Sequence, residues 1–545
     1  MKLKLLIIEV FSLLLFVEIQ GQQWIRIYGD SVNTVINTVF EHYDKGYIFS
    51  GERYNPGFTV YGWILKTDIN GEDLWSKSLG NLSTITRLFS AKSTIDGGVI
   101  EVGLFKASSP GCCDPMIIKL NSCGEKEWCK IYYAPYCYST CYDICLLDDG
   151  GYIALMDHLK SGEEETIWLF RLDSLGEVIW AQVYATDPSF ESEWSHSLLK
   201  TTDSCFVITG EAYYPDSTYP NKWIIKIILI KVNLNGEAIF EVPWGTNNGI
   251  YSDGRLSVID VKNNIYTAGR RARTSAPYGD SPCLFKTSVT GEPVFYKDLK
   301  STTIAGIATT INWFQDSSLV FCAQWKESSG IDTTGAIKTD SLGNEVKRIV
   351  FPDNYGIYGS DITFNNRLIL GGSGYSSGYL YGCALKLTSD LEFDSIYTTP
   401  FTYDSLCPHP IISDTISLDD CEEVIVGIDE ALQNPETAKL HVFPNPSTER
   451  ITIEIPKYLV RRTGGQADGR TNGLGISATT IYHQWKEVRL EVFDLFGRLM
   501  YCEMIPQQEK PVELDISTWP GGMYVARMVF MNEVVGSAKF IVEKL

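Results

Sequence analysis

Histidine is scarce in this chain, although enzymes commonly use it for acid–base chemistry and metal binding. The 545 residues include only six histidines, and they are widely scattered: His42, His158, His196, His409, His441 and His483. The sequence also lacks the G-x-S-x-G, H-E-x-x-H and P-loop motifs, and no G-x-G-x-x-G follows a predicted strand. Because catalytic and metal sites need several convergent groups, we predict no enzyme, no catalytic residue and no metal site.

Positive charge is also in short supply. The chain has 46 Lys and Arg against 67 Asp and Glu, which gives a formal net charge of −21. Such an acidic protein repels phosphate backbones, so nucleic acid is excluded as an expected partner. Hydrophobic residues make up 44% and charged residues 21% of the chain, which is the composition of a globular protein. Aromatic residues at 12% favour β-structure.

Beyond the N-terminus, no hydrophobic run is long enough for a transmembrane helix. The first residues combine Lys2 and Lys4 with an apolar stretch over 5–17 and a small residue at Gly21. This order is typical of a secretory signal peptide, which we assign to 1–21. No Cys follows the apolar stretch at the position where a lipid would be attached. We therefore predict a secreted protein, located extracellularly or at the outer-membrane surface.

The cysteines support export. Seven of the 14 lie between Cys112 and Cys145, without a histidine among them. In an exported protein this cluster predicts disulfides rather than a metal site, because the paired spacing of metal ligands is missing. The connectivity stays open within the cluster. A further small bridge is predicted between Cys407 and Cys421.

Self-similarity is the strongest feature of the sequence. A unit containing Gly-Tyr-Ile, a loop, Trp-Ile-x-Lys and Asp-x-x-Gly-x-x-x-Trp recurs about every 53 residues. The positions that match Tyr47 are Val99, Tyr152, Phe206, Ile265, Leu319 and Leu368. A cation recurs at Lys66, Lys119, Arg171, Lys231, Lys286, Lys338 and Lys386. A glycine follows this cation at a fixed distance in every copy except the last, where Leu391 replaces it.

The pattern within each unit predicts four short antiparallel strands, with a tight glycine turn between the third and the fourth. We therefore predict an all-β protein whose residues 22–403 form a β-propeller of about seven four-stranded blades. Six or eight blades stay open. The segment 23–29 resembles a fourth strand that would close the ring against the last blade. The segment 393–397 offers a competing fourth strand.

The C-terminal region has a different pattern. Residues 404–435 are predicted as a linker, followed by short alternating strands over 436–545 with an insertion at 457–486. The region resembles the type A C-terminal sorting domain of the bacterial type IX secretion system. The matching residues are Pro444, Asn445, Pro446, Gly497, Gly521, Gly522, Tyr524 and Lys539. The resemblance implies an Ig-like β-sandwich, export across the outer membrane of a Bacteroidetes-type bacterium, and the secretion machinery as a partner.

Two recurring features are assigned to structure rather than to ligand binding. Turns such as that at Asp68 and Asn70 are rich in oxygen ligands, but calcium needs six or more of them, so no cofactor is predicted. The recurring tryptophans could be sugar platforms, but their fixed repeat positions favour packing between blades. They comprise Trp63, Trp168 and Trp223 on the third strands and Trp75, Trp128 and Trp180 on the fourth.

The loops between second and third strands vary, and all emerge on one face of a propeller. Variable loops on a rigid scaffold commonly carry function, and Tyr and Arg are frequent in binding surfaces. The candidate ligand residues on this face are Tyr54, Tyr213, Tyr214, Tyr219, Arg271, Arg273, Tyr278, Tyr375 and Tyr379.

These observations leave three functional hypotheses. The first is a secreted or surface binding protein, such as an adhesin, with an unknown extracellular glycan or protein as its ligand. The second is an extracellular propeller hydrolase acting on polysaccharide or peptide, which would require paired carboxylates near the channel. The third is a structural component of the cell surface. The fold by itself does not choose among them.

Overall fold

The computed structural model describes most of the chain, and the conclusions below concern these residues. The described ranges are 23–29, 32–55, 59–80, 84–106, 113–133, 137–160, 165–184, 192–215, 223–244, 252–273, 279–300, 303–327, 330, 332–353, 355–376, 378–425, 440–454, 489–494, 498–504, 511–530 and 533–544. Two compact units divide the chain, Met1–Gly427 and Ile428–Leu545. Within the described ranges both units contain strands and no helix, and therefore no helix that could cross a membrane.

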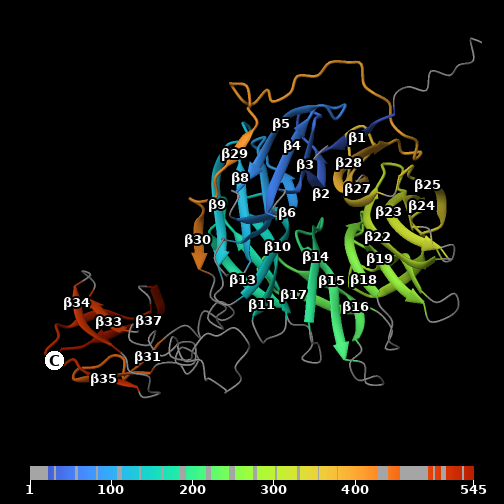
Figure 1. The fold of residues 1–545 in the computed structure, drawn as a ribbon. Coiled ribbons are helices and arrows are strands. Elements are labelled where there is room, and N and C mark those ends of the chain that lie inside the picture. Colours follow the sequence, from blue (N-terminus) through green and yellow to red (C-terminus); the bar gives the residue numbers. More distant parts are fainter. Residues whose placement is uncertain are drawn as a thin grey trace, which may run out of the picture. The chain divides into compact units, whose positions relative to one another are not determined.

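Seven antiparallel sheets, numbered here as blades 1 to 7, make up the first unit (Figure 1). Blade 1 contains β2 (Asn33–Glu41), β3 (Tyr47–Tyr54), β4 (Val60–Thr67) and β5 (Asp73–Leu79), and blade 2 contains β6 (Ile85–Ser93), β7 (Val99–Lys106), β8 (Asp114–Leu120) and β9 (Lys126–Tyr133). Blade 3 contains β10 (Cys137–Leu146), β11 (Tyr152–Lys160), β12 (Glu165–Leu172) and β13 (Val178–Tyr184), and blade 4 contains β14 (Ser192–Lys200), β15 (Phe206–Pro215), β16 (Trp223–Val232) and β17 (Ala238–Trp244). Blade 5 contains β18 (Ser252–Ile259), β19 (Ile265–Arg273), β20 (Gly279–Thr287) and β21 (Pro293–Asp298), and blade 6 contains β22 (Thr303–Trp313), β23 (Leu319–Glu327), β24 (Asp332–Thr339) and β25 (Glu345–Val350). Blade 7 combines β26 (Gly356–Ile362), β27 (Leu368–Ser376) and β28 (Tyr379–Leu387) with β1 (Ile25–Tyr28).

The blades form a closed ring. The first strand of every blade contacts the first strand of the next, and β26 of blade 7 contacts β2 of blade 1. The N-terminal strand β1 pairs antiparallel with β28 and so becomes the fourth strand of blade 7. This confirms the predicted all-β propeller and resolves its blade number as seven. The competing segment 393–397 contributes only isolated bridges, Leu387 to Phe393 and Gln23 to Ser395.

The recurring cation ties the turns of one blade together. Lys119 Nζ donates to Asp96 in the turn before the second strand at 2.8 Å, and Lys231 and Lys338 make the same contact with Asp203 and Asp316. Each of these ammonium groups is almost completely buried. A buried charge is tolerated only when it is paired and hydrogen-bonded. Lys66 and Arg171 make the same contact with Asp44 and Asp149, so five of the seven repeats combine the cation with an acidic turn residue.

The recurring glycine and tryptophan join neighbouring blades. Gly71 has a φ of +79°, the left-handed conformation expected for the turn, and Leu391 adopts a φ of +57° in the copy that lacks glycine. A Cβ on Gly176 would lie 3.0 Å from Trp128 of the preceding blade, and one on Gly236 would lie 3.1 Å from Trp180. The fourth-strand tryptophans thus pack over the next blade, as predicted. The Asp68 carboxylate accepts the backbone N–H groups of Asn70 and Glu72 and caps its turn.

Residues 404–425, called the strap below, follow the propeller along two outer edges. The strap carries β29 (Asp414–Ile416), which pairs parallel with β5, and β30 (Glu422–Ile425), which pairs parallel with β9. Figure 1 shows both strands in orange beside blades 1 and 2. The strap therefore adds a fifth strand to each of two blades, although the sequence predicts this region as a linker.

Two disulfides attach the strap to blade 2, Cys123–Cys407 and Cys129–Cys421. The predicted Cys407–Cys421 bridge is wrong, because each of these cysteines reaches a partner almost 300 residues away in the sequence. Within the predicted disulfide cluster, Cys113, Cys141 and Cys145 are free thiols. Cys123 and Cys129 therefore pair outward, with a segment that sequence proximity did not indicate, whereas Cys112 and the side chain of Cys137 lie outside the described part of the chain.

The second unit contains two sheets around one apolar core. One sheet has the order β31 (His441–Phe443), β32 (Arg450–Glu454) and β35 (Val512–Asp515). The other has the order β34 (Leu499–Met504), β33 (Arg489–Asp494), β36 (Gly522–Phe530) and β37 (Glu533–Val542). Ile451 and Ile453 from the first sheet share the core with Leu490 and Phe540 from the second. This arrangement is a β-sandwich.

Candidate functional site

A β-bulge recurs in the innermost strand of every blade. The register shifts around one unpaired residue at the same repeat position in all seven strands. These residues are Asn37, Phe89, Tyr142, His196, Arg255, Thr309 and Tyr358. All are partly exposed, and the rings of Phe89 and Tyr142 from adjacent blades lie 5.4 Å apart. The bulges therefore place seven side chains of six residue types, with tyrosine occurring twice, on the innermost strands around the central channel. Bulges often re-aim side chains beside functional sites.

Blade 4 combines an aromatic pair with a buried carboxylate on its two innermost strands. The name channel mouth is used below for Trp194, His196, Glu211 and Tyr213 of blade 4 together with Asp253, Arg255, Arg270 and Asp280 of blade 5. Trp194 on β14 is 40% exposed, and its ring centroid lies 6.0 Å from that of Tyr213 on β15. The Tyr213 hydroxyl donates to Glu211 Oε1 at 3.3 Å, and His196 Nε2 lies 3.6 Å from the same oxygen. Glu211 is 3% exposed, and its Oε2 has no hydrogen-bond partner among the described residues.

Blade 5 contributes two arginines that share one carboxylate. Arg255 on β18 and Arg270 on β19 each place an Nη2 atom 2.9 Å from Asp253 Oδ2. Asp253 is 1% exposed, and its Oδ1 finds no partner within the described part of the chain. Both arginine side chains are one-third exposed. Arg270 also lies 3.8 Å from Asp280 on β20.

The two halves of the mouth are electrostatically linked. Burial raises the pKa of the Glu211 carboxyl, but His196, Arg255 and Arg270 outweigh burial, and the pKa lies below its usual value. Burial lowers the pKa of Arg270, whereas Asp253, Asp280 and Glu211 raise it further, so the guanidinium stays charged. Burial raises the pKa of Tyr213 to about 12, helped by Glu211. The mouth therefore holds the ionised carboxylate of Glu211, the charged guanidinium of Arg270 and the neutral phenol of Tyr213, which can donate and accept hydrogen bonds together.

A second pair of blades repeats part of this arrangement. Tyr54 and Glu52 in blade 1 occupy the repeat positions of Tyr213 and Glu211, and the Tyr54 hydroxyl donates to Glu52 at 2.7 Å. Arg87 of blade 2 lies 3.2 Å from Glu52. However, Val35 and Asn37 stand where blade 4 has Trp194 and His196. Blade 1 thus has the polar motif without the exposed aromatic side chain.

The predicted ligand residues have different environments. Tyr213 lies at the channel mouth and Tyr54 at the equivalent position of blade 1, whereas Tyr214 packs against the core of blades 3 and 4 with Lys226 4.4 Å above its ring. Arg271 lies 4.0 Å above the ring of Tyr296. The exposed pair Tyr375 and Tyr379 lies at the β27–β28 hairpin, 70% and 54% exposed.

Three predicted ligand residues fall in regions for which no side-chain position is described. Tyr219 and Tyr278 lie outside the described residues, and Arg273 is described only through its backbone pairing with Gly279.

Sequence reasoning missed most of the channel mouth, including His196, Glu211, Asp253 and Arg255 as a group. One signal was present. The position five residues after the Tyr47 anchor is acidic in three copies, at Glu52, Asp157 and Glu211, although it lies on a strand between two others. A charged residue at such a position indicates a paired or functional group.

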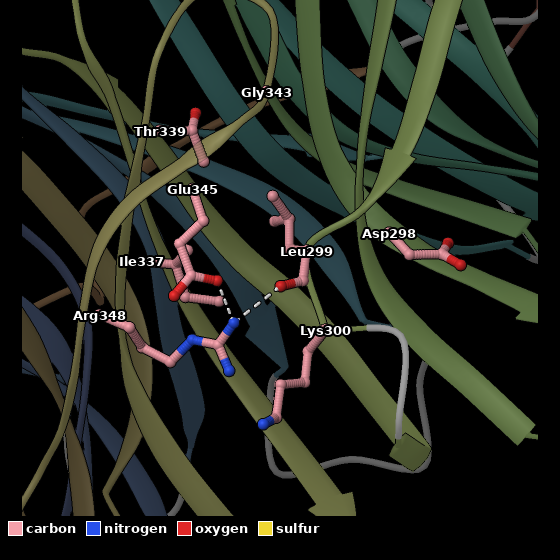
Figure 2. Close-up of a pocket in the computed structure, with 8 residues that line it drawn as sticks. All are labelled: Asp298, Leu299, Lys300, Ile337, Thr339, Gly343, Glu345 and Arg348. Atoms are coloured by element: carbon pink, nitrogen blue, oxygen red, sulfur yellow. Dashed lines mark hydrogen bonds and ion pairs between the residues drawn. The ribbon is translucent and has the colours of Figure 1, made fainter.

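A separate groove lies on the outer strands between blades 5 and 6. Its cavity of about 320 Å³ is lined by Asp298, Leu299, Lys300, Ile337, Thr339, Gly343, Glu345 and Arg348. Figure 2 shows that Arg348 is bound by Glu345 and by the Leu299 carbonyl oxygen, which lies 3.2 Å from Nη2. None of the eight lining residues is aromatic, so the groove is a weaker candidate than the channel mouth.

Cys123, Cys407 and His409 also lie close together, with their ligand atoms within 4.8 Å of one another. The two sulfur atoms form a disulfide. They therefore cannot serve as thiolate ligands while this bond is intact.

The predicted sorting motif lies mainly at one end of the β-sandwich. Pro444 and Pro446 follow cis peptide bonds. Asn445 between them accepts the Ile541 N–H at 2.8 Å, and its amide donates to the Lys539 carbonyl at 3.3 Å. The Tyr524 ring stacks on Phe540 at 5.6 Å. Gly521 and Gly522 precede Tyr524 at the start of β36, whereas Gly497 lies outside the described residues.

The C-terminal unit matches a known family. Residues 471–543 match the secretion system C-terminal sorting domain. The match includes Gly497, Gly521, Gly522, Tyr524 and Lys539, and it begins after Pro446. The chain therefore carries a type IX secretion sorting domain and is a secreted or cell-surface protein that is handled by this machinery.

No curated protein matches the chain. Among solved structures, a Dyadobacter fermentans protein of unknown function is 10% identical, with a TM-score of 0.42 over 56% of this chain and 95% of its own. An ulvan lyase of polysaccharide lyase family PL25 is 8% identical, with a TM-score of 0.44 over 64% of this chain and 93% of its own. A streptogramin B lyase is 10% identical, with a TM-score of 0.34 over 66% of this chain and 97% of its own. These TM-scores are too low to support any argument about function.

Proposed function

We propose that this exported propeller binds an extracellular glycan at the channel mouth over blades 4 and 5. The observation that carries the proposal is the exposed Trp194 beside Tyr213, directly next to the carboxylate of Glu211. A pyranose ring offers an apolar face of C–H groups to an aromatic side chain and hydroxyl groups to charged neighbours. Sites for small ligands typically combine aromatic surface with a few convergent polar groups.

The position of the site agrees with this proposal. Trp194 and His196 lie on the innermost strand, and Glu211 and Tyr213 lie on its hydrogen-bonded neighbour. Strands hold side chains more firmly than loops do, so little order has to be created when a ligand binds. Most tryptophans of the propeller pack between blades, so the exposed position of Trp194 is unusual.

The test is a binding screen of the full chain against a glycan array, with three variants. We expect Trp194→Ala to weaken binding of the selected glycan by about tenfold or more, because the aromatic contact is lost. Tyr213→Phe should weaken it by a smaller factor through Glu211. The matched control is Tyr54→Phe, which removes the equivalent hydroxyl in blade 1 and should leave binding unchanged.

Two results would contradict the proposal. Equal binding by the parent and the Trp194→Ala variant would place the glycan elsewhere. Binding of peptides but of no glycan would identify a different ligand class. Release of new reducing ends from a bound glycan would instead support the hydrolase hypothesis, for which Glu211, Asp253 and Asp280 are the carboxylates at the mouth.

A further inference from the structure

We infer that the glycan taken at this mouth is neutral, rather than one that bears uronate, sulfate or amino groups. This inference rests on the proposed function and names its ligand class. It comes from the charges and the unpaired polar atoms that the two blades place together.

The cationic groups of the mouth are already neutralised. Two guanidinium groups, Arg255 and Arg270, share Asp253 at 2.9 Å each, and Arg270 has Asp280 as a second anionic neighbour. Glu211 adds another negative charge that acts on Arg270. Three carboxylates thus surround two guanidinium groups. An anionic sugar would have to displace an internal carboxylate and leave it buried without its partner, which is costly.

The unpaired atoms are suited to hydroxyl groups. Glu211 Oε2 and Asp253 Oδ1 are shielded acceptors without partners among the described residues, and Arg255 Nε and Arg270 Nε are shielded donors without partners. Leaving such atoms unpaired is unfavourable. These four atoms are closed to solvent, so a ligand reaches them only when the one-third-exposed guanidinium groups shift. A hydroxyl group donates one hydrogen bond and accepts others, so hydroxyls can then serve both kinds of atom. A carboxylate or sulfate only accepts, and an ammonium only donates.

The net charge of the whole chain also disfavours anionic glycans. The chain carries a formal net charge of −21, which repels polyanionic polysaccharides before they reach the mouth. An amine-bearing glycan would be attracted at long range. At the mouth, however, its ammonium can only donate, so it cannot serve the Nε donors of Arg255 and Arg270.

The experiment measures binding of the full chain by calorimetry against three sets of oligosaccharides. The neutral set contains cello-, manno-, xylo- and laminari-oligosaccharides, the acidic set oligogalacturonate, oligoalginate and sulfated galactan, and the cationic set glucosamine oligomers. We expect binding of a neutral oligosaccharide whose dissociation constant changes less than about twofold between 50 and 500 mM salt, because no net charge is neutralised. Trp194→Ala should abolish it, and Tyr54→Phe should not.

A variant tests the charge argument directly. Asp280→Asn removes one carboxylate from the rim of the mouth, where Asp280 is 28% exposed. We expect this variant to bind the acidic oligosaccharides about tenfold more tightly than the parent does, with a marked salt dependence. Unchanged affinity for the acidic set would contradict the charge argument.

The possible failures can be told apart. Salt-dependent binding of the acidic or cationic set by the parent chain, lost in Trp194→Ala, would overturn the neutral ligand while keeping the proposed site. Binding of no oligosaccharide in any set would overturn the proposed function itself. Circular dichroism and thermal melting of each variant establish that a loss of binding is not a loss of fold.

Discussion

Glu101 places a carboxyl group in the wall between blades 1 and 2. It is completely buried on β7, and Ser50 of blade 1 donates to its Oε2 at 2.6 Å. Burial raises its pKa to about 8, and the Ser50 hydrogen bond lowers it only partly. The group is therefore uncharged in the folded protein at neutral pH, as buried carboxyls without a cationic partner generally are.

This carboxyl makes stability depend on pH. The unfolded chain loses the proton near pH 4.5, whereas the folded protein keeps it up to about pH 8. Because the folded state binds more protons between these values, the stabilising contribution is complete below pH 4.5 and is lost as the pH rises toward 8. The loss is on the order of 5 kcal/mol.

We expect Glu101→Gln to remove this dependence, because the amide resembles the protonated acid and does not ionise. In thermal unfolding from pH 5 to 9, the Tm of the variant should match the parent at pH 5 and exceed it at pH 8.5. The control is Glu392→Gln, whose side chain is 73% exposed and which should follow the parent throughout. A parallel fall of Tm in the parent and in Glu101→Gln would show that another group is responsible.

At the scale of a single element, β1 decides whether the ring is closed. Its flanking Trp24 is fully buried and donates its indole N–H to the Ile69 carbonyl of blade 1 at 2.9 Å. Tyr28 at its other end donates to the Gly71 carbonyl at 3.0 Å. Tyr132 and Tyr184 make the same contact to the next blade. The N-terminal strand thus reproduces a blade-to-blade contact that the rest of the repeat makes within a continuous chain.

We expect Trp24→Ala to lower the free energy of unfolding by about 3–5 kcal/mol, the usual cost of deleting a buried tryptophan. Denaturant unfolding followed by circular dichroism measures this change. Trp194→Ala is the matched control, because Trp194 is exposed and should shift stability by less than about 1 kcal/mol. Equal destabilisation by both substitutions would contradict the closing role of β1.

At the scale of the whole propeller, the strap follows blade 7 in the chain and pairs with the edges of two other sheets. Its strands are short and pair with one neighbour each, through β29 on β5 and β30 on β9. Short edge strands alone are weakly stable. Two disulfides also hold the strap on the propeller. Two ion pairs, Lys77 with Asp414 and Lys130 with Glu422, both at 2.7 Å, contribute further.

We expect the double substitution Cys407→Ser and Cys421→Ser to detach the strap without opening the ring. Hydrogen exchange should accelerate at the amides of 414–416 and 422–425, while strands β14 to β17 exchange as in the parent. Substituting only Cys129 and Cys421 should release 422–425 more than 414–416, because Cys407 stays bonded. Unchanged protection in the double variant would show that the strap is held by its strand pairing alone.

The number and type of strands were predictable because they depend on local signals repeated many times. Tyr47, Lys66 and Gly71 each mark one place in a blade, and the copies reinforce one another. The resemblance of 23–29 to a fourth strand also predicted the closing strand. The channel mouth was less predictable because Trp194, Glu211 and Arg255 look like ordinary polar or core residues when each is read in its own repeat.

The sequence alone determined the all-β repeat, the sorting domain and the export of this protein, because strand periodicity, turn glycines and terminal motifs act over a few neighbouring residues. Only the tertiary structure decided which distant residues meet. The sequence could not select Cys123 and Cys129 as the partners of Cys407 and Cys421, because disulfide pairing depends on distances in space. For the same reason, the electrostatic interaction of Glu211 with Arg270 follows from the packing of blade 4 against blade 5, whose charges carry no local signal of each other.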